Sequence, residues 1–120
     1  MSSQSCIFCK IISKELSAQV IDETNDLIVI ADIHPKAPIH YLIIPKIHIS
    51  KLSDVTDDQQ ALLGNILLMA KKLSGQLPHD NQDFRLVCNN GANAGQIVFH
   101  LHFHFLAGKS MRHELGKELA

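Results

Sequence analysis

The chain lacks the features that indicate a secreted or membrane protein. It has only three cysteines in 120 residues, too few for a small domain built on disulfide bonds. No apolar run approaches the roughly 20 residues that a membrane-spanning helix needs. The polar residues 1–5 also lack the apolar core of a signal peptide. We therefore expect a cytoplasmic protein that does not enter a membrane.

An excess of charge of either sign is missing too. Eleven Lys and Arg face twelve Asp and Glu, the net charge is -1, and no block of basic residues occurs. Because nucleic-acid-binding surfaces are normally basic, we expect no nucleic-acid partner. A small anionic ligand remains compatible with this balance, since one local pocket can be positive on a neutral protein.

The chain length and composition predict one domain over residues 1–120. A hydrophobic fraction of 46% is ordinary for a globular domain of this size. There is no internal repeat, and no Gly/Ser linker divides the chain. Hydrophobic patterning predicts a short helix, several strands, a long helix and further strands. The expected strands cover residues 20–21, 27–31, 40–44, 84–88 and 98–106, and the expected short helix covers residues 7–13.

The long helix is predicted to begin at Thr56. The run Thr56-Asp57-Asp58-Gln59 fits a capping box, and Gly75 is a plausible end. The apolar positions form a wide stripe that either covers its own sheet only or also contacts a second subunit. The turn-rich loop 89–97 is short enough for a hairpin-like connection. We therefore expect an antiparallel sheet in an α+β domain.

Three histidines alternate with apolar residues in the last expected strand. In a strand, His100, His102 and His104 share one face, while the phenylalanines and Leu101 between them share the other. Imidazole titrates near neutral pH, attacks electrophiles and binds metals. The pattern therefore predicts a reactive site or a metal site.

The sequence also contains the elements of a zinc site. Three histidines along one straight strand point roughly parallel, so they need not converge on one ion. Cys6 and Cys9 have the Cys-x-x-Cys spacing of a zinc half-site. His48 and one strand histidine are candidates for the two remaining ligands of a closed structural site. A redox dithiol is the alternative, although no βαβ pattern surrounds the two cysteines.

Phosphorus chemistry is the reaction that best suits the central histidine. A neutral imidazole attacks phosphorus well when its other nitrogen is hydrogen-bonded. The equatorial oxygens of the phosphorus also need hydrogen-bond donors. Asn89, Gln96 and main-chain N–H groups near Gly95 are candidates for that role next to His102.

Four stretches of the chain resemble the histidine triad (HIT) family. The pattern His-φ-His-φ-His-φ-φ, with φ hydrophobic, stands at 100–106. Residues 6–12, 32–40 and 44–49 are similar to the family's first helix, its loop before a core strand, and its Ile-Pro-Lys-x-His run. The nearest branch is Hint-like, of the bacterial type with an N-terminal Cys-x-x-Cys.

This resemblance implies both a fold and an activity. The implied fold is an α+β domain with an antiparallel β-meander, one long and one short helix, and a homodimer whose sheets join. The implied activity is hydrolysis of nucleoside phosphoramidates at the α-phosphorus through a nucleotidyl-histidine, with a purine nucleotide (AMP or an AMP conjugate) as ligand. Two alternatives stay open: a nucleotide- or partner-binding protein without turnover, and a dinucleoside polyphosphate hydrolase or nucleotidyl transferase.

The resemblance also assigns roles to residues of this chain. His102 matches the nucleophile, His40 and His104 match the histidines beside it, and Asp32 matches the acceptor for the ribose hydroxyls. The positions that match phosphate contacts are Asn89, Gly95, Gln96 and Val98. The positions that match the base pocket are Ile7, Phe8, Ile11, Ile30 and Ile33. Those that match a structural zinc site are Cys6, Cys9, His48 and His100.

Two positions depart from the family's pattern. Many Hint-like members have Ser or Thr where this chain has Ile97, which cannot donate a hydrogen bond to phosphate. The tail 111–118 lacks the Trp-Pro-Pro-Gly ending of many of these proteins. The resemblance therefore does not extend to substrate preferences that depend on the tail.

Overall fold

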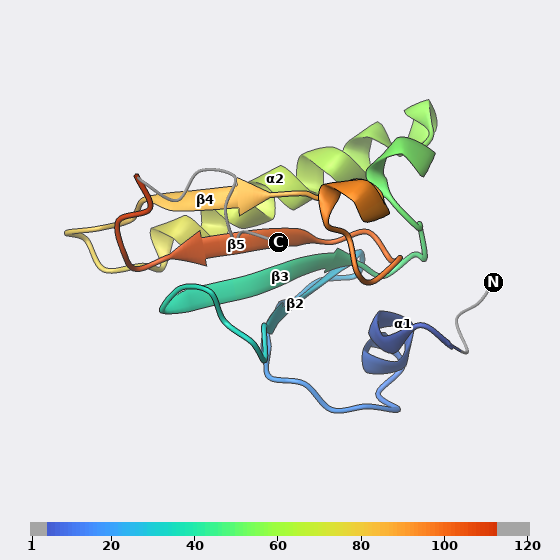
Figure 1. The fold of residues 1–120 in the computed structure, drawn as a ribbon, viewed down its shortest axis with the longest axis horizontal. Coiled ribbons are helices and arrows are strands. Elements are labelled where there is room, and N and C mark those ends of the chain that lie inside the picture. The colour runs from blue at the N-terminus through green and yellow to red at the C-terminus, as the bar shows by residue number, and fades with distance from the viewer. Residues whose placement is uncertain (1–4, 113–120) are drawn as a thin grey trace.

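A five-stranded antiparallel sheet forms the centre of the computed structural model, which describes residues 5–112 (Figure 1). The strands lie in the order β1-β2-β3-β5-β4. Only the first three strands follow one another as a meander, because β5 lies between β3 and β4. The strands are β1 (Val20–Glu23), β2 (Leu27–Ala31), β3 (Ile39–Pro45), β4 (Phe84–Val87) and β5 (Phe103–Ala107); the helices are α1 (Ile7–Ile12) and α2 (Gln60–Gly75).

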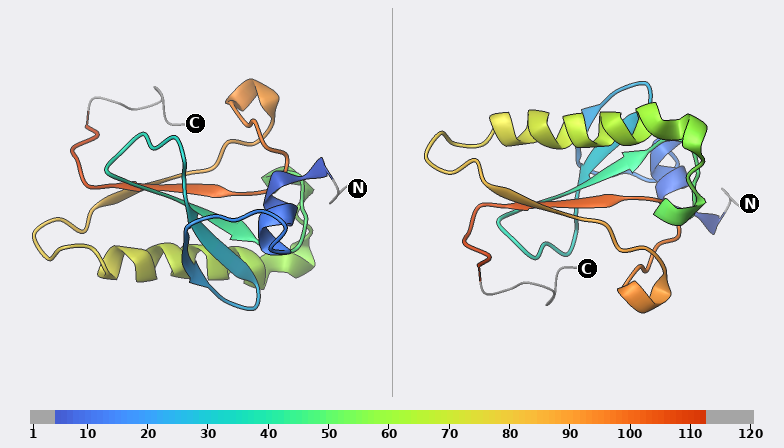
Figure 2. Two further views of the ribbon diagram at one scale, coloured as in Figure 1. Left: turned by 90° about the horizontal axis from the view of Figure 1, so that it is seen from below. Right: turned by 90° about the horizontal axis from the view of Figure 1, so that it is seen from above.

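Helices cover both faces of the sheet. Figure 2 shows α2 running along one side, with the short turn at Ala92–Ala94 on the other side and α1 at one end. Strand β2, which lies between β1 and β3, is buried on both faces, and this explains its unbroken apolar run. The cluster under α2 contains Leu27, Val29, Ile43, Ile66, Met69, Ala70, Leu73 and Phe105. The cluster under α1 contains Phe8, Ile11, Ile28, Ile30, Leu42 and Ile44.

The predicted start of the long helix is close to the observed one. A capping box joins Thr56 and Gln59, whose side chain accepts a hydrogen bond from the Thr56 N–H at 2.9 Å. Residues Asp57–Gln59 form a 3₁₀ turn, so the α-helix itself begins at Gln60. Gly75 is its last residue. None of the helices in the described range is both long and apolar enough to cross a membrane.

The last strand is shorter than the predicted strand at 98–106, and this prediction was wrong for residues 98–102. The register pairs Ile43 of β3 with Phe103 of β5. Continuing it would place Leu101 opposite Pro45, which has no amide hydrogen to donate. The chain leaves the sheet there, and the Leu101 N–H donates instead to the Ile49 carbonyl at 2.7 Å. His100 and His102 therefore lie outside β5, and only His104 lies within it.

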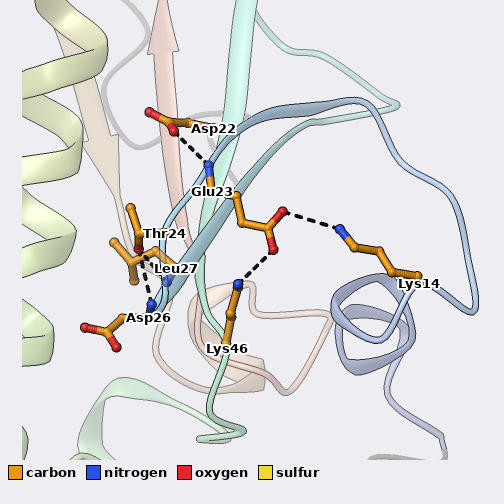
Figure 3. A network of polar contacts seen from close by, with 7 residues as sticks. All are labelled: Lys14, Asp22, Glu23, Thr24, Asp26, Leu27 and Lys46. Atoms are coloured by element: carbon orange, nitrogen blue, oxygen red, sulfur yellow. Dashed lines mark hydrogen bonds and ion pairs between the residues drawn. The ribbon is translucent and has the colours of Figure 1, made fainter.

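Ion pairs occupy the β1 edge of the sheet. Glu23 binds Lys14, which follows α1, at 3.3 Å and Lys46, which follows β3, at 2.7 Å (Figure 3). Asp22 binds Lys72 of α2 at 2.8 Å. These pairs connect the edge strand to both helical regions. They also place charge on this edge, which disfavours strand addition there.

Candidate active site and metal centre

Two cysteines and two histidines from distant parts of the chain converge beside α1. The Cys6 sulfur lies 3.3 Å from His100 Nδ1, and the Cys9 sulfur lies 3.3 Å from His48 Nδ1 and 3.5 Å from His100 Nδ1. The two histidine Nδ1 atoms are 3.1 Å apart. Cys6 and Cys9 stand at the start of α1, His48 follows β3, and His100 precedes β5. The predicted ligand set is therefore assembled in space.

His100 is oriented as a metal ligand. Its Nε2–H donates a hydrogen bond to the Pro45 carbonyl at 2.7 Å, so this nitrogen carries the hydrogen and Nδ1 presents its lone pair to the sulfurs. The ring is fully buried, and this burial holds the pKa of His100 below its usual value. A neutral imidazole with a carbonyl partner behind it is the usual form of a metal-binding histidine.

The residues present fit zinc. Zn–S bonds of about 2.3 Å and Zn–N bonds of about 2.0–2.1 Å at tetrahedral angles separate S and N ligands by about 3.5 Å and two N ligands by about 3.3 Å. The observed separations of 3.1–3.5 Å are close to these values. Without a cation, burial and the neighbouring Cys6 raise the pKa of the Cys9 thiol to about 11. A bound cation would replace the thiol protons of the two cysteines.

A second group, formed by Asp32, His40 and His104, brings ligand-type atoms equally close but is not arranged for a metal. The Lys36 N–H donates to His40 Nδ1 at 3.0 Å, so the hydrogen of His40 stands on Nε2. That nitrogen lies 2.9 Å from His104 Nδ1 and 3.4 Å from the Asp32 carboxylate. Its hydrogen is donated to His104 Nδ1 beside the Asp32 carboxylate, and a metal bound there would have to displace that hydrogen.

The same hydrogen bonds determine the state of His104. Because His104 Nδ1 accepts from His40, its hydrogen lies on Nε2, which is therefore a donor. Burial, and then the proximity of His102 and His40, lowers the pKa of His104 to about 4. Burial also lowers the pKa of His40. Both rings are therefore neutral near pH 7.

His102 carries its hydrogen on the other ring nitrogen from His104, so its lone pair is on Nε2. Its Nδ1–H donates to the His100 carbonyl at 2.8 Å, which leaves Nε2 unprotonated in the neutral ring. Burial lowers its pKa as well. The ring stands 5.1 Å from the His104 ring and 5.1 Å from Phe8, measured between centroids. A ring with an unprotonated Nε2 and a ring with a protonated Nε2 are thus neighbours.

The loop at 89–97 is held together by Gln96. Its side-chain oxygen accepts from the Gly91 N–H at 2.8 Å, and its amide nitrogen donates to the carbonyls of Ser50 and Val98 at 2.9 and 3.0 Å. The Gln96 side chain therefore supports the loop in this structure. Contacts of Asn89, Gly95, Gln96 and Val98 with phosphate stay predictions.

The five residues predicted to surround a base fall into two groups. Phe8, Ile11 and Ile30 are buried in the cluster beneath α1. Ile7 and Ile33 are exposed, Ile33 at 83% of its surface. Asp32, next to Ile33, uses one carboxylate oxygen to accept the His34 N–H at 2.8 Å. The base pocket and the ribose contact also stay predictions.

Two groups that shape the site were not identified from the sequence. The Pro45 carbonyl fixes the ring of His100, and the Lys36 N–H fixes the ring of His40. Both are main-chain groups, whose partners depend on the folded path of the chain and leave no side-chain signal. The proline at position 45 was the only available indication, and it was interpreted as a strand end.

Comparison with known proteins identifies the family. The HIT domain model matches residues 13–111, so this chain belongs to the HIT family. It is 45% identical over 107 residues to an uncharacterised HIT-like protein of Synechocystis, covering 89% of this chain and 93% of the relative. A solved structure of a HIT family hydrolase from Legionella pneumophila has 45% identity and a TM-score of 0.85, covering 89% of this chain and 96% of that one.

Two further solved structures are relevant to ligands. A histidine triad nucleotide-binding protein from Candida albicans is 39% identical, with a TM-score of 0.76 and coverage of 88% of this chain and 76% of that one. A zinc-bound histidine triad family protein from Mycobacterium smegmatis is 28% identical, with a TM-score of 0.78 and coverage of 93% and 81%. The family and its fold are thereby confirmed for this chain.

We predict that the protein purified without added metal contains about one zinc ion per chain. Cys6→Ser should remove it, because the site then loses one of two thiolates. Cys88→Ser is the matched control, since Cys88 lies outside the cluster. Elemental analysis of the three proteins measures the outcome. Absence of zinc from the wild type, or its retention in Cys6→Ser, would contradict the assignment.

Acid is expected to destabilise the fold through His104. Its pKa falls from 6.5 to about 4 on folding, so the unfolded chain binds more protons between these values and the free energy of unfolding decreases as pH falls through this window. The loss from His104 is about 2–3 kcal/mol. Urea unfolding between pH 7 and pH 4 should show a shallower loss in His104→Gln. Equal pH dependence in both proteins would show that His104 does not carry the effect.

Proposed function

We propose that this protein is a hydrolase that cleaves nucleoside phosphoramidates at the α-phosphorus and releases AMP or a related purine nucleotide. The observation that carries the proposal is the hydrogen bond from His102 Nδ1 to the His100 carbonyl at 2.8 Å, because it leaves Nε2 as a lone-pair nucleophile. The HIT family hydrolase and the nucleotide-binding protein among the related structures support this direction.

The first step forms a covalent intermediate. His102 Nε2 attacks the α-phosphorus in line, a new N–P bond forms, and the P–N bond to the amine breaks. His104 Nε2–H lies beside the attacking ring and donates a hydrogen bond to a phosphate oxygen, which stabilises the charge that develops there. The departing amine takes up a proton from water.

Water completes the reaction. Its oxygen attacks the same phosphorus, the bond to His102 breaks, and the nucleoside monophosphate leaves. Over both steps one water molecule is consumed. One of its hydrogens ends on the amine, and its hydroxyl group ends on phosphorus. His40 keeps His104 in the donor tautomer throughout, because its Nε2–H occupies His104 Nδ1.

The proposed zinc has a structural part in this scheme. Cys6, Cys9, His48 and His100 would hold it, and its charge would stabilise the two thiolates. The closed set of four protein ligands leaves no position for substrate, so the metal would contact no reacting atom. We place the protein in the cytoplasm, where thiols remain reduced and available to zinc.

Ile97 supports a second candidate function. This residue is 83% exposed at the loop beside the site and offers no hydroxyl to a phosphate or a leaving group. A protein with the same pocket but poor transition-state stabilisation would bind nucleotides without useful turnover. Tight AMP binding without hydrolysis of any phosphoramidate or diadenosine polyphosphate would favour this candidate.

We predict that His102→Ala lowers kcat for adenosine phosphoramidate by at least about 10³-fold, because the nucleophile is removed. His79→Ala, an exposed histidine outside the site, is the matched control and should keep normal turnover. Release of AMP measures both, with diadenosine polyphosphates as competing substrates. Normal turnover in His102→Ala would eliminate the mechanism, and a preference for the polyphosphates would reassign the substrate class.

We also propose a homodimer in which the sheets join through β4. Ion pairs occupy the β1 edge, β4 is the other edge of the sheet, and α2 exposes Leu67 and Leu68 at 57% and 61% of their surfaces. Such adjoining exposed leucines suit an interface.

Leu67→Glu should convert the dimer into a monomer, because it buries a charge in the interface. Leu16→Glu changes an exposed leucine that follows α1 and is not part of α2, and it should leave the dimer intact. Light scattering after gel filtration measures the masses. A monomeric wild type, or a dimeric Leu67→Glu, would remove this part of the proposal.

A further inference from the structure

His100 belongs to both parts of the site at once. Its side chain faces the two cysteine sulfurs through Nδ1, at 3.3 and 3.5 Å. Its main-chain carbonyl accepts the hydrogen bond from His102 Nδ1 at 2.8 Å. The residue at the metal centre is therefore also the residue that orients the nucleophile.

The segment that carries these groups receives no support from strand pairing. Residues 98–102 precede β5 and are not part of the sheet. Two hydrogen bonds connect its main chain to neighbouring loops: the Leu101 N–H donates to the Ile49 carbonyl, and the Val98 carbonyl accepts from the Gln96 side chain. The side chain of His100, fully buried, is held by Pro45 and the cysteines. The position of its carbonyl thus depends on what holds its ring.

A second contact runs from α1 to the nucleophile. Phe8 lies between the two cysteines in sequence, and its ring meets His100 edge-on at 5.9 Å and His102 edge-on at 5.1 Å. Phe8 and Cys9 lie in the first turn of α1, with Cys6 as the N-cap, so the ring of Phe8 is carried by the same turn as the two cysteines. The His100 carbonyl and the Phe8 ring thus both connect the metal-ligand region to the ring of His102.

We propose that the Cys6/Cys9/His48/His100 centre, when it holds metal, positions the catalytic nucleophile: it fixes His100, whose carbonyl keeps His102 with Nδ1 protonated and Nε2 directed at phosphorus. This inference rests on the proposed function for its kinetic consequence only. His100 is a positioning residue, and it touches no reacting atom. A purely structural centre would hold α1 and stabilise the fold without this effect on His102.

The experiment compares three variants with the wild type. Cys9→Ser removes a thiolate ligand, Cys9→His replaces it with another zinc ligand, and Cys88→Ser changes a cysteine outside the centre. Each protein is measured in three ways: the ¹H–¹⁵N signal of His102 Nδ1–H, the Kd for AMP, and the single-turnover rate with adenosine phosphoramidate. His102→Ala identifies the signal. Circular dichroism and thermal unfolding confirm that each variant is folded at the measuring temperature.

We expect Cys9→Ser to lose the protected His102 Nδ1–H signal and at least tenfold in single-turnover rate, with less than a threefold change in AMP affinity. Cys9→His should restore the signal and most of the rate when loaded with zinc, and Cys88→Ser should match the wild type. If Cys9→Ser does not fold, removing zinc from the wild type with a chelator gives the same comparison.

The proposal is overturned if folded, zinc-free protein keeps the His102 signal, or if rate and AMP affinity fall equally. The second result would mean that the centre only supports α1 and the predicted base pocket. A wild type that hydrolyses no phosphoramidate defeats the proposed function, and the proton signal and AMP affinity then decide the positioning role alone.

Discussion

The end of the β3–β5 ladder at Ile43 and Phe103, just before Pro45, is the constraint on which the site depends. Proline cannot donate a ladder hydrogen bond, so the chain that follows the loop at 89–97 joins β5 only from Phe103 onward. The Pro45 carbonyl is then available, and it accepts the hydrogen from His100 Nε2. Pro45 thereby ends the strand and orients the ring of His100. The carbonyl of His100 then accepts a hydrogen bond from His102 Nδ1.

Hydrogen-bond partners separate histidines that the sequence presents as equivalent. A carbonyl behind His100 directs a lone pair toward two sulfurs, whereas a main-chain N–H behind His40 directs a hydrogen toward His104. A carbonyl behind His102 directs its lone pair toward substrate space. In the proposed function, these three rings of the same type serve as metal ligand, donor relay and nucleophile. These differences follow from the fixed donors and acceptors of the main chain.

The sequence predicted much of this architecture. Periodicity predicted β2 with its observed bounds and placed α1, β3, β4 and α2 within a few residues, because hydrophobic alternation and caps are local signals. The Cys-x-x-Cys spacing, together with His48, predicted the ligand cluster. The strand at 98–106 could not be delimited, since its alternation continues through residues 98–102 while its pairing partner stops at Pro45. The position of β5 between β3 and β4 depends on long-range pairing that local patterns do not encode.

The central claim, that His102 becomes covalently bonded to phosphorus, has one direct test. Wild-type protein is mixed with adenosine phosphoramidate, quenched within one turnover, and digested for mass spectrometry under conditions that preserve N–P bonds. The account predicts an adenylyl group on the peptide that contains His102, located on that ring by fragmentation. An adduct on His104 or another residue, or hydrolysis without any adduct in a single turnover, would contradict it.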